Sequence, residues 1–290
     1  MPAPTNTITT SDINFGIEVD FVRRYEQSIQ RLLDILGIFG VEQTRAGQVM
    51  KTYTVSGQLN TAAEQRAEGE EVPLSKYGLT TATIDQIGFL AERKMTTGEA
   101  IAASGYEAAV AKTDEKFRRD CLTKQFDDFL TWLVPTGTPE SGTTLQAALA
   151  KVDAKLADTA ETAGYSYDNV AHFVPRSYVT DFLADADLTL TGENMFGLTY
   201  LENFLGTANI FVTNKVSKIV ATPADNIRIF GIDYGELAKG ELTYTTGDMG
   251  LIGIAHEPAK DRVSTQTHVL MPKNNFYAEI TSFIVAGEVA

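Results

Sequence analysis

The sequence contains few of the side chains on which most enzymes and metal sites depend. Its 290 residues include one cysteine, Cys121, and three histidines. A single cysteine excludes an intramolecular disulfide and a zinc site built from several thiolates. The sequence also lacks a Gly-X-Ser-X-Gly elbow, a Walker loop and a Gly-X-Gly-X-X-Gly segment after a strand. It therefore carries no local signature of acyl transfer or of nucleotide binding.

Basic residues are scarce as well. The chain has 24 Lys and Arg against 38 Asp and Glu, which gives a formal net charge of −14. Such a surface repels phosphate backbones, and no basic stripe interrupts it. We expect no direct binding of nucleic acid.

Long apolar segments are also missing. No run approaches the roughly 20 residues that span a bilayer. The N-terminal sequence MPAPTNTITTSD has neither the basic start nor the apolar core of a signal peptide, and no Asn-X-Ser/Thr acceptor occurs. These absences predict an intracellular protein that does not bind membranes.

What is present is typical of a folded protein, because 43% of the residues are hydrophobic and 21% are charged. Apolar residues three and four apart predict amphipathic helices over 15–37, about 105–134 and roughly 144–160. The segment Thr96-Thr97-Gly98-Glu99 has the character of a helix start, with a threonine as the N-cap and a carboxylate in the first turn.

Residues 48–95 are rich in β-branched side chains and predict two long strands. The simplest arrangement is a hairpin with its tip near 64–72 and arms of about 15 residues, or roughly 50 Å each. A two-stranded hairpin is marginally stable alone in water. This one must lie on its own chain or on a neighbour.

The predicted tip, AEQRAEGEEVPLSKYG, is strongly acidic. Its charged residues are Glu64, Arg66, Glu68, Glu70, Glu71 and Lys76. A calcium loop needs oxygen ligands at alternate positions and a closing Glu, and this spacing does not supply them. The remaining interpretations are a solvated acidic loop and an arm that contacts another molecule.

The second half predicts short elements: a strand over 170–174, a helix over 177–187, and a short helix over 198–206 ending at Gly206. Strands over 210–216, 218–223 and 226–232 follow, and further strands after residue 242 predict a terminal antiparallel sheet. The fold class is therefore α+β.

An enzyme remains an alternative, because a Ser-His-Asp set can be assembled from distant residues. The candidate bases are His172, within an apolar strand, and His256. The His256-Glu257 pair starts like an HExxH zinc helix, but residue 260 is Lys and Pro258 would break the helix. No residue pattern predicts a metal site or a cofactor.

The order of these features resembles the major capsid proteins of tailed phages, which share the Hong Kong 97-type fold. Two segments carry the resemblance most clearly: Glu68 to Ser75 (EGEEVPLS), followed by Thr80 to Ile84 (TTATI). They are similar to that family's extended loop and the strand that returns to its spine helix. The segments 205–213 and 229–231 resemble its axial domain, and 250–285 its peripheral domain.

The resemblance implies an α+β fold in five parts. These are an N-terminal arm and helix over 1–47, an extended hairpin loop over 48–95, a spine helix with part of the peripheral domain over 96–141, an axial domain over 142–235, and the peripheral-domain sheet over 236–290. The charged residues of the extended loop, listed above, would then form contacts between subunits.

The implied function is structural rather than enzymatic. The chain would assemble as hexamers and pentamers into an icosahedral head that encloses double-stranded DNA without binding it specifically, within the virion, after assembly in the host cytoplasm. Scaffolding, portal and decoration proteins would be separate partners. Lys76 with Asn274 or Asn275 would be the candidates for a cross-link, but nothing in the sequence supplies its glutamate-assisted site. An encapsulin-type nanocompartment shell is the alternative within the same fold.

Overall fold

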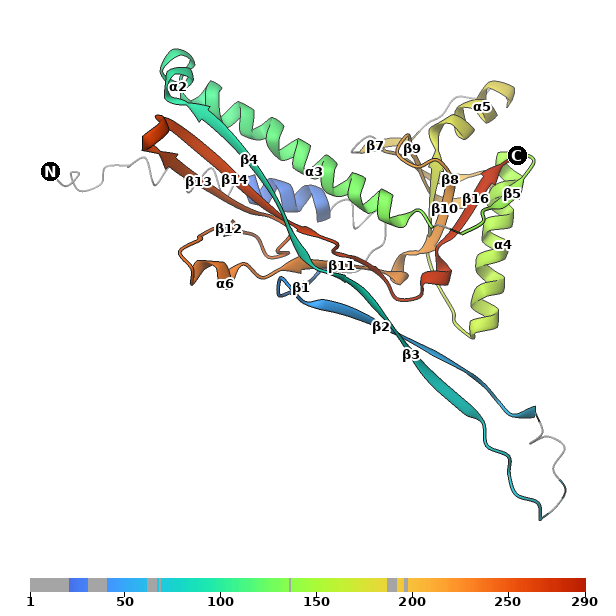
Figure 1. The fold of residues 1–290 in the computed structure, drawn as a ribbon. Helices are drawn as coiled ribbons and strands as arrows, with labels where there is room; N and C mark the ends of the chain where they lie inside the picture. The colour runs from blue at the N-terminus through green and yellow to red at the C-terminus, as the bar shows by residue number, and fades with distance from the viewer. Residues whose placement is uncertain are drawn as a thin grey trace.

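The computed structural model describes residues 21–30, 41–61, 67, 69–135, 137–186, 192–195 and 198–290. The described chain forms an elongated body from which one long hairpin projects (Figure 1). Residues 21–30 are helical, as the sequence predicts, whereas the N-terminal arm and the flanks of that predicted helix lie outside the described residues.

The long central helix has an irregular beginning. The N-cap of helix α2 (Gly98–Ser104) is Thr97, whose side chain accepts a hydrogen bond from the amide of Ala100. The predicted threonine N-cap is thus confirmed, and the structure assigns it to Thr97 rather than Thr96. A π-helical segment (Glu107–Ala111) then leads directly into α3 (Lys112–Leu133). The apolar face of α3 is buried along its length through Cys121, Leu122, Phe126, Phe129, Leu130 and Leu133. The 3.6-residue pattern in the sequence thus identified the buried face.

The other helices are shorter. They are α4 (Leu145–Ala163), α5 (Arg176–Ala186) and α6 (Gly235–Ala238). Helix α4 is capped at both ends. The Thr144 side chain accepts a hydrogen bond from the Ala147 amide at the N-terminus, and Gly164 adopts the left-handed conformation at the C-terminus.

A four-stranded sheet lies along α3 (Figure 1). Its strand order is β12 (Thr245–Thr246), β13 (Gly253–Ala259), β14 (Ser264–Lys273) and β4 (Gly88–Thr97), all antiparallel. Side chains from this sheet, from residues 21–30 and from α3 share one hydrophobic core.

A seven-stranded mixed sheet forms the opposite end of the body, with α4 and α5 packed against it. Its order is β5 (Glu140–Gly142), β16 (Val285–Val289), β10 (Ile219–Pro223), β6 (Val170–Pro175), β9 (Thr207–Thr213), β8 (Leu198–Phe204) and β7 (Glu193–Met195). A three-stranded sheet of β1 (Val41–Thr44), β11 (Ile227–Ile232) and β15 (Phe276–Ala278) completes the body.

The prediction of a short helix over 198–206 is wrong. These residues form β8, which pairs with β9 through the register Phe204↔Thr207. Leu205 and Gly206 both have positive φ, at 57° and 86°, as the two central residues of a tight hairpin turn require. Gly206 thus closes a hairpin rather than a helix.

The prediction of a single terminal antiparallel sheet is also wrong. Strands β13 and β14 form the expected hairpin, but β15 pairs with β11 and β16 joins β10 and β5 in the seven-stranded sheet. The chain is redirected at Ile280, whose amide and carbonyl both bond to the side chain of Asn226, at 2.8 and 3.1 Å. Buried backbone groups need such partners when a strand ends.

Candidate inter-subunit surface

The projecting hairpin consists of β2 (Val49–Gln58) and β3 (Lys76–Gln86). The strands pair antiparallel from Val49↔Gln86 to Gln58↔Lys76, with an irregularity between Val49 and Lys51. At 10 and 11 residues they are shorter than the predicted 15, because after Gln86 the chain leaves the hairpin and pairs with β14 as β4. The paired part still reaches about 33 Å at 3.3 Å per residue.

The base of the hairpin is fixed firmly to the body. The Gly47 amide donates to the carbonyl of Ile87 at 2.8 Å, and the Ile87 amide donates to the carbonyl of Gln48 at 3.2 Å. The Gln86 side-chain amide reaches the Gly47 carbonyl at 2.5 Å. Ile87 itself is fully buried, so one apolar side chain anchors the point at which the hairpin leaves the body.

Beyond the paired strands, Asn60 holds the two sides of the loop together. Its backbone amide donates to the Ser75 hydroxyl at 2.9 Å, and its side-chain amide donates to the Leu74 carbonyl at 3.3 Å. These bonds extend the cross-strand connection past the last ladder pair. The segment 72–75 therefore has a fixed partner across the loop.

The predicted contact residues fall into two groups. Glu70, Glu71 and Lys76 are exposed on the projecting loop, whereas Glu64, Arg66 and Glu68 lie outside the described residues. One carboxylate oxygen of Glu70 accepts from the Ala67 amide at 3.1 Å. The three predicted residues that the structure describes are thus accessible to solvent. Their contacts with a neighbouring subunit remain a prediction.

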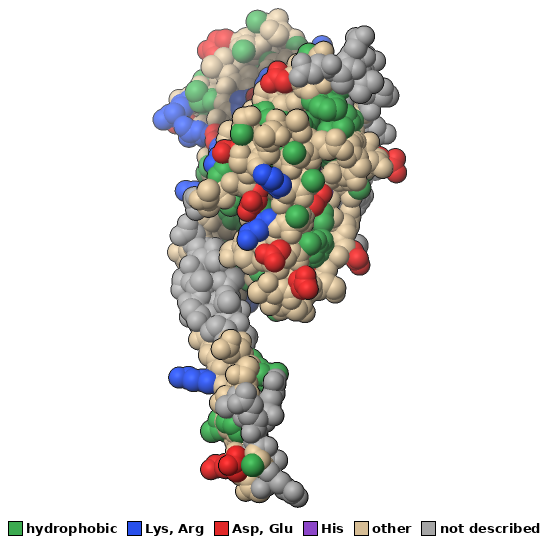
Figure 2. Space-filling model, turned by 90° about the vertical axis from the view of Figure 1, so that its right-hand side faces the viewer, with side chains coloured by type: hydrophobic (Ala, Val, Ile, Leu, Met, Phe, Trp, Pro, Cys, Tyr) green, Lys and Arg blue, Asp and Glu red, His purple; other side chains and the backbone are tan. Residues whose placement is uncertain are grey.

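The same hairpin carries an apolar set of side chains that was not predicted from the sequence. Its members are large hydrophobic side chains that solvent reaches: Leu59, Val72, Leu74, Tyr77 and Leu79. Leu74 is 91% exposed. Figure 2 shows hydrophobic side chains along the projecting arm, with acidic ones near its end. The available signal was the occurrence of Val72 and Leu74 within a loop that otherwise selects polar residues.

We call Leu59, Val72 and Leu74 the apolar apex. Isolated exposed hydrophobic residues are common, but several together on a protruding element mark an interaction site. An extended two-stranded element has no core of its own in which to bury them. A surface on another molecule is the remaining place for their burial.

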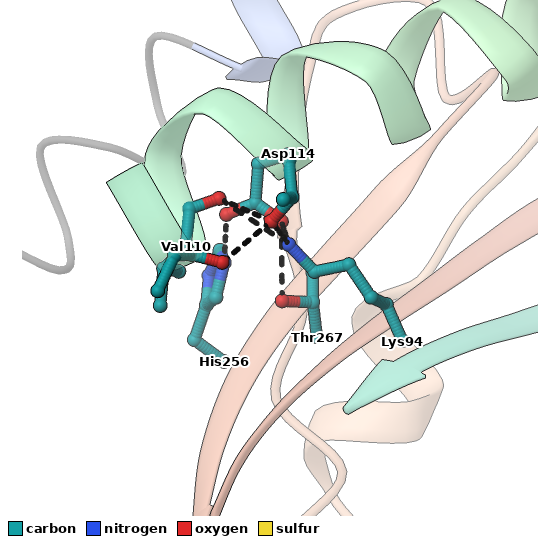
Figure 3. Close-up of polar contacts among 7 residues, drawn as sticks. Lys94, Val110, Asp114, His256 and Thr267 are labelled. Carbon is teal, nitrogen blue, oxygen red and sulfur yellow. Dashed lines mark hydrogen bonds and ion pairs between the residues drawn. The ribbon is translucent and has the colours of Figure 1, made fainter. Parts of the chain in front are cut away.

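A buried polar cluster joins α3 to the four-stranded sheet (Figure 3). Asp114 lies at its centre, with Lys94 Nζ at 2.5 Å and His256 Nε2 at 3.1 Å, and it accepts from the Thr267 hydroxyl at 3.3 Å. The Lys94 ammonium also donates to the Val110 carbonyl at 3.3 Å, in the π-helical segment. The cluster therefore ties the irregular start of the helix to β4, β13 and β14.

The electrostatics of this cluster are those of a satisfied ion pair. Burial by itself raises the pKa of Asp114, but hydrogen bonds from His256 and Lys94, together with the charge of Lys94, lower it by more. The pKa of Asp114 therefore lies below its ordinary value, and the carboxylate stays ionised. An ionised carboxylate carries no proton to donate, so Asp114 in this ion pair is not suited to act as a general acid.

The two histidines proposed as catalytic bases are both held in buried polar contacts. His172 places Nε2 at 2.7 Å from Asp153 Oδ1 and Nδ1 at 3.1 Å from the Ala208 carbonyl. The side chain of His256 is 2% exposed. A general base must reach substrate, and rings enclosed in this way are typical of structural histidines.

In the part of the chain that the structure describes, no group of three or more His, Cys, Asp or Glu residues is arranged to hold a metal ion. None of the helices in this part is both long and apolar enough to cross a bilayer.

Comparison with solved structures identifies the architecture. An encapsulin, the holo-SrpI complex of Synechococcus elongatus PCC 7942, matches over 88% of this chain and 86% of its own, with a TM-score of 0.57 and 8% identity. The capsid protein of a native GTA particle matches over 89% and 90%, with a TM-score of 0.53 and 11% identity. The capsid protein of cyanophage A-1(L) matches over 86% and 93%, with a TM-score of 0.52 and 13% identity.

These likenesses lie in structure alone. No protein-family model matches the sequence, and no curated protein matches it. Identities of 8–13% establish a shared fold and nothing finer. The projecting hairpin, the long helix beside a four-stranded sheet, and the separate seven-stranded end together give this chain the Hong Kong 97-type fold of phage capsid and encapsulin subunits.

Proposed function

We propose that this chain is a structural subunit that assembles with copies of itself into an icosahedral shell, and that the shell is the head of a tailed phage enclosing double-stranded DNA. The observation that carries the proposal is the hairpin. It projects away from the body and exposes Leu59, Val72 and Leu74 at its far end. A lone subunit gains nothing from such an element, whereas a subunit that covers it with a neighbour buries apolar surface at about 25 cal/mol per Å².

The same proposal divides the chain into five parts. In this division 1–47 would be an arm with a helix, 48–95 the extended loop, 96–141 the spine and part of the peripheral domain, 142–235 the axial domain and 236–290 the peripheral-domain sheet. Glu64, Arg66, Glu68, Glu70, Glu71 and Lys76 would contact neighbouring subunits. Exposed ion pairs contribute only about 0–1 kcal/mol each, so the apolar apex would provide most of the stabilisation at this contact.

The net charge is consistent with enclosed DNA. With a formal charge of −14, the subunit repels phosphate and does not hold the packaged molecule by sequence-independent contacts. A shell that releases its DNA must not bind it tightly. The subunit would take part in packaging only as a container and would need neither a metal nor a cofactor.

An encapsulin-type compartment is the second candidate, because the encapsulin of Synechococcus elongatus matches the fold over 88% of this chain. The two candidates differ in content. Particles from the producing organism should contain nuclease-resistant DNA of defined length if they are phage heads, and enclosed protein without such DNA if they are compartments.

Assembly itself is tested on the purified chain. Negative-stain microscopy and light scattering should show capsomers or closed shells. A uniform 31.6 kDa monomer at high protein concentration would contradict both shell functions. Replacing residues 64–72 by a short Gly-Ser linker should abolish shells while circular dichroism of the subunit stays unchanged, and normal shells from this variant would contradict the role of the hairpin.

A further inference from the structure

The ring of His172 connects three elements at the seven-stranded end of the body. Helix α4 lies against this sheet (Figure 1), and the His172 side chain, on β6, is 4% exposed beneath it. Nε2 of the ring lies 2.7 Å from Oδ1 of Asp153 on α4, and Nδ1 lies 3.1 Å from the carbonyl oxygen of Ala208 on β9. Both ring nitrogens therefore contact an oxygen of another element.

Both of these oxygens can only accept a hydrogen bond, because neither a carbonyl nor a carboxylate carries a proton. A neutral imidazole has one N–H group, so it can donate to Asp153 or to Ala208 but not to both. Its other nitrogen then directs a lone pair at an oxygen. An imidazolium has two N–H groups and satisfies both contacts.

The contact with Asp153 has the length of a charge-assisted hydrogen bond. Bonds between a cationic N–H and a carboxylate are about 2.7–2.9 Å long and are roughly twice as strong as neutral ones. The distance of 2.7 Å from Nε2 to Asp153 lies in this range. The Asp153 side chain is 41% exposed, so it keeps its contact with solvent while it binds the buried ring. The carboxylate can thus stabilise a cation without being fully desolvated itself.

The neighbouring charges do not compete for the ring. The strands on either side of β6 are β9 and β10, and neither contains a charged residue. Two lysines flank Asp153 on α4, and both have other contacts. Lys151 donates to the Ser141 carbonyl, and Lys155 pairs with Asp158 at 3.8 Å.

Helix α5 packs against the same core as α4. Its Arg176 donates to the Thr199 hydroxyl at 3.0 Å, and its Asp181 is exposed. Among the described charged side chains of these elements, Asp153 is the one that forms an ion pair with His172.

His256 is in a different electrostatic environment. Its Nε2 also approaches a carboxylate, that of Asp114, at 3.1 Å. Asp114 is already paired with Lys94 at 2.5 Å, and a second cation beside the same buried carboxylate would be repelled by the first. Of these two buried histidines, His172 is the one whose surroundings favour the cation.

We propose that His172 is a proton-operated clasp of the seven-stranded end. With two N–H groups, the ring binds Asp153 and Ala208 together and ties α4 to β9. When the pH rises and the ring loses one proton, one of the two hydrogen bonds is lost and a lone pair faces an oxygen. The clasp lies within one subunit, so it goes beyond the proposed function and operates whether or not copies assemble.

Urea unfolding of the full chain tests the clasp between about pH 5.5 and about pH 8.5, an interval that brackets the pKa of about 6.5 of an unperturbed histidine. The test variant is His172→Gln. The matched control is His268→Gln, at the half-buried histidine of β14 whose ring contacts the Gln266 amide. Because a folded state that binds the proton more tightly loses stability as the pH rises, the wild type should lose the contribution of the clasp over this interval.

The quantity to compare is the unfolding equilibrium constant of each variant divided by that of the wild type. For His172→Gln this ratio should fall by about tenfold or more from the lower to the upper pH, the effect expected from one charge-assisted hydrogen bond. For His268→Gln the ratio should stay constant. A constant ratio for His172→Gln as well would overturn the proposal.

The protons on the ring can also be observed directly, which keeps the proposal testable if His172→Gln does not fold. Nitrogen-15 NMR of histidine-labelled protein, in solution for subunits or in the solid state for shells, distinguishes rings with two N–H groups from rings with one. At about pH 7, where an unperturbed histidine is mostly neutral, His172 should carry two N–H groups in the wild type and one in Asp153→Asn. A wild-type His172 ring with one N–H group at this pH would overturn the clasp.

Discussion

The Lys94 ammonium lies 2.5 Å from the Asp114 carboxylate, in an interior where Asp114 is 3% exposed and Lys94 19%. The two residues connect strand β4 to the start of α3, next to the π-helical segment, and His256 and Thr267 complete the contacts of Asp114. One carboxylate thus holds three strands of the sheet against the helix.

Replacing Asp114 by alanine should strongly destabilise the subunit. The variant leaves Lys94 charged and enclosed without its partner, and removing one member of a buried pair typically costs about 3–5 kcal/mol. The free energy of unfolding of unassembled subunits, measured in urea, should fall by this amount. The matched control is Asp120→Ala on the same helix, where an exposed pair with Lys116 is lost and about 0–1 kcal/mol is expected. Equal effects in the two variants would contradict this account.

The ion pair of Lys94 and Asp114 also predicts how the stability of the folded subunit depends on pH. The pKa of Asp114 is lower in the folded protein than in the unfolded chain, so the folded state binds its proton less readily. The stabilisation that ionised Asp114 provides is therefore complete above the pKa of about 3.9 that an aspartate has in the unfolded chain. It is lost as the pH falls through the pKa of Asp114 in the folded protein. Below about pH 5, unfolding free energies of the wild type should fall more steeply with decreasing pH than those of Asp114→Asn. Parallel curves would show that Asp114 is not the group responsible.

Leu74→Ser should separate assembly from folding. Leu74 is 91% exposed, so the change should alter the free energy of unfolding by no more than about 0.5 kcal/mol. Shell formation, followed by light scattering, should fall sharply because the apolar apex loses its most exposed side chain. Leu242→Ser, a similar change at another exposed leucine of the body, is the control and should assemble normally. Loss of assembly in both variants would point to general insolubility instead.

Cys121 should be inert in the folded subunit. Burial, followed by the charges of Glu92 and Asp120, raises the pKa of this thiol to about 12. Only the thiolate reacts with disulfide reagents, and at pH 8 almost none is present. A colorimetric thiol assay should therefore give close to zero groups per native chain and one group in denaturant. Rapid reaction of the native protein would show that the packing around α3 is looser than described.

Local patterns predicted the elements whose stability is local. The stripe on α3 from Cys121 to Leu133, the capping by Thr97 and the presence of a hairpin around the acidic segment all followed from periodicity and side-chain chemistry. The segment 198–206 failed because its leucines at 198, 201 and 205 suit a helix as well as a strand. Pairing with β9, which no local rule contains, decided between them.

The charged part of the candidate surface was visible in the sequence as Glu70, Glu71 and Lys76, while the exposure of Leu59 and Leu74 was not. Exposure depends on what lies opposite a side chain, and here no described part of the chain covers these two leucines.

The sequence by itself determined the acidic, cysteine-poor composition, the long amphipathic helix and the extended arm. These depend on residue type and on repeats of two or 3.6 residues along the chain. Only the tertiary structure decided that β15 and β16 leave the terminal strands for other sheets, and that Asp114 meets Lys94 and His256. Contacts between distant residues arise from packing a common core, and single-sequence periodicity carries no information about which faces will meet.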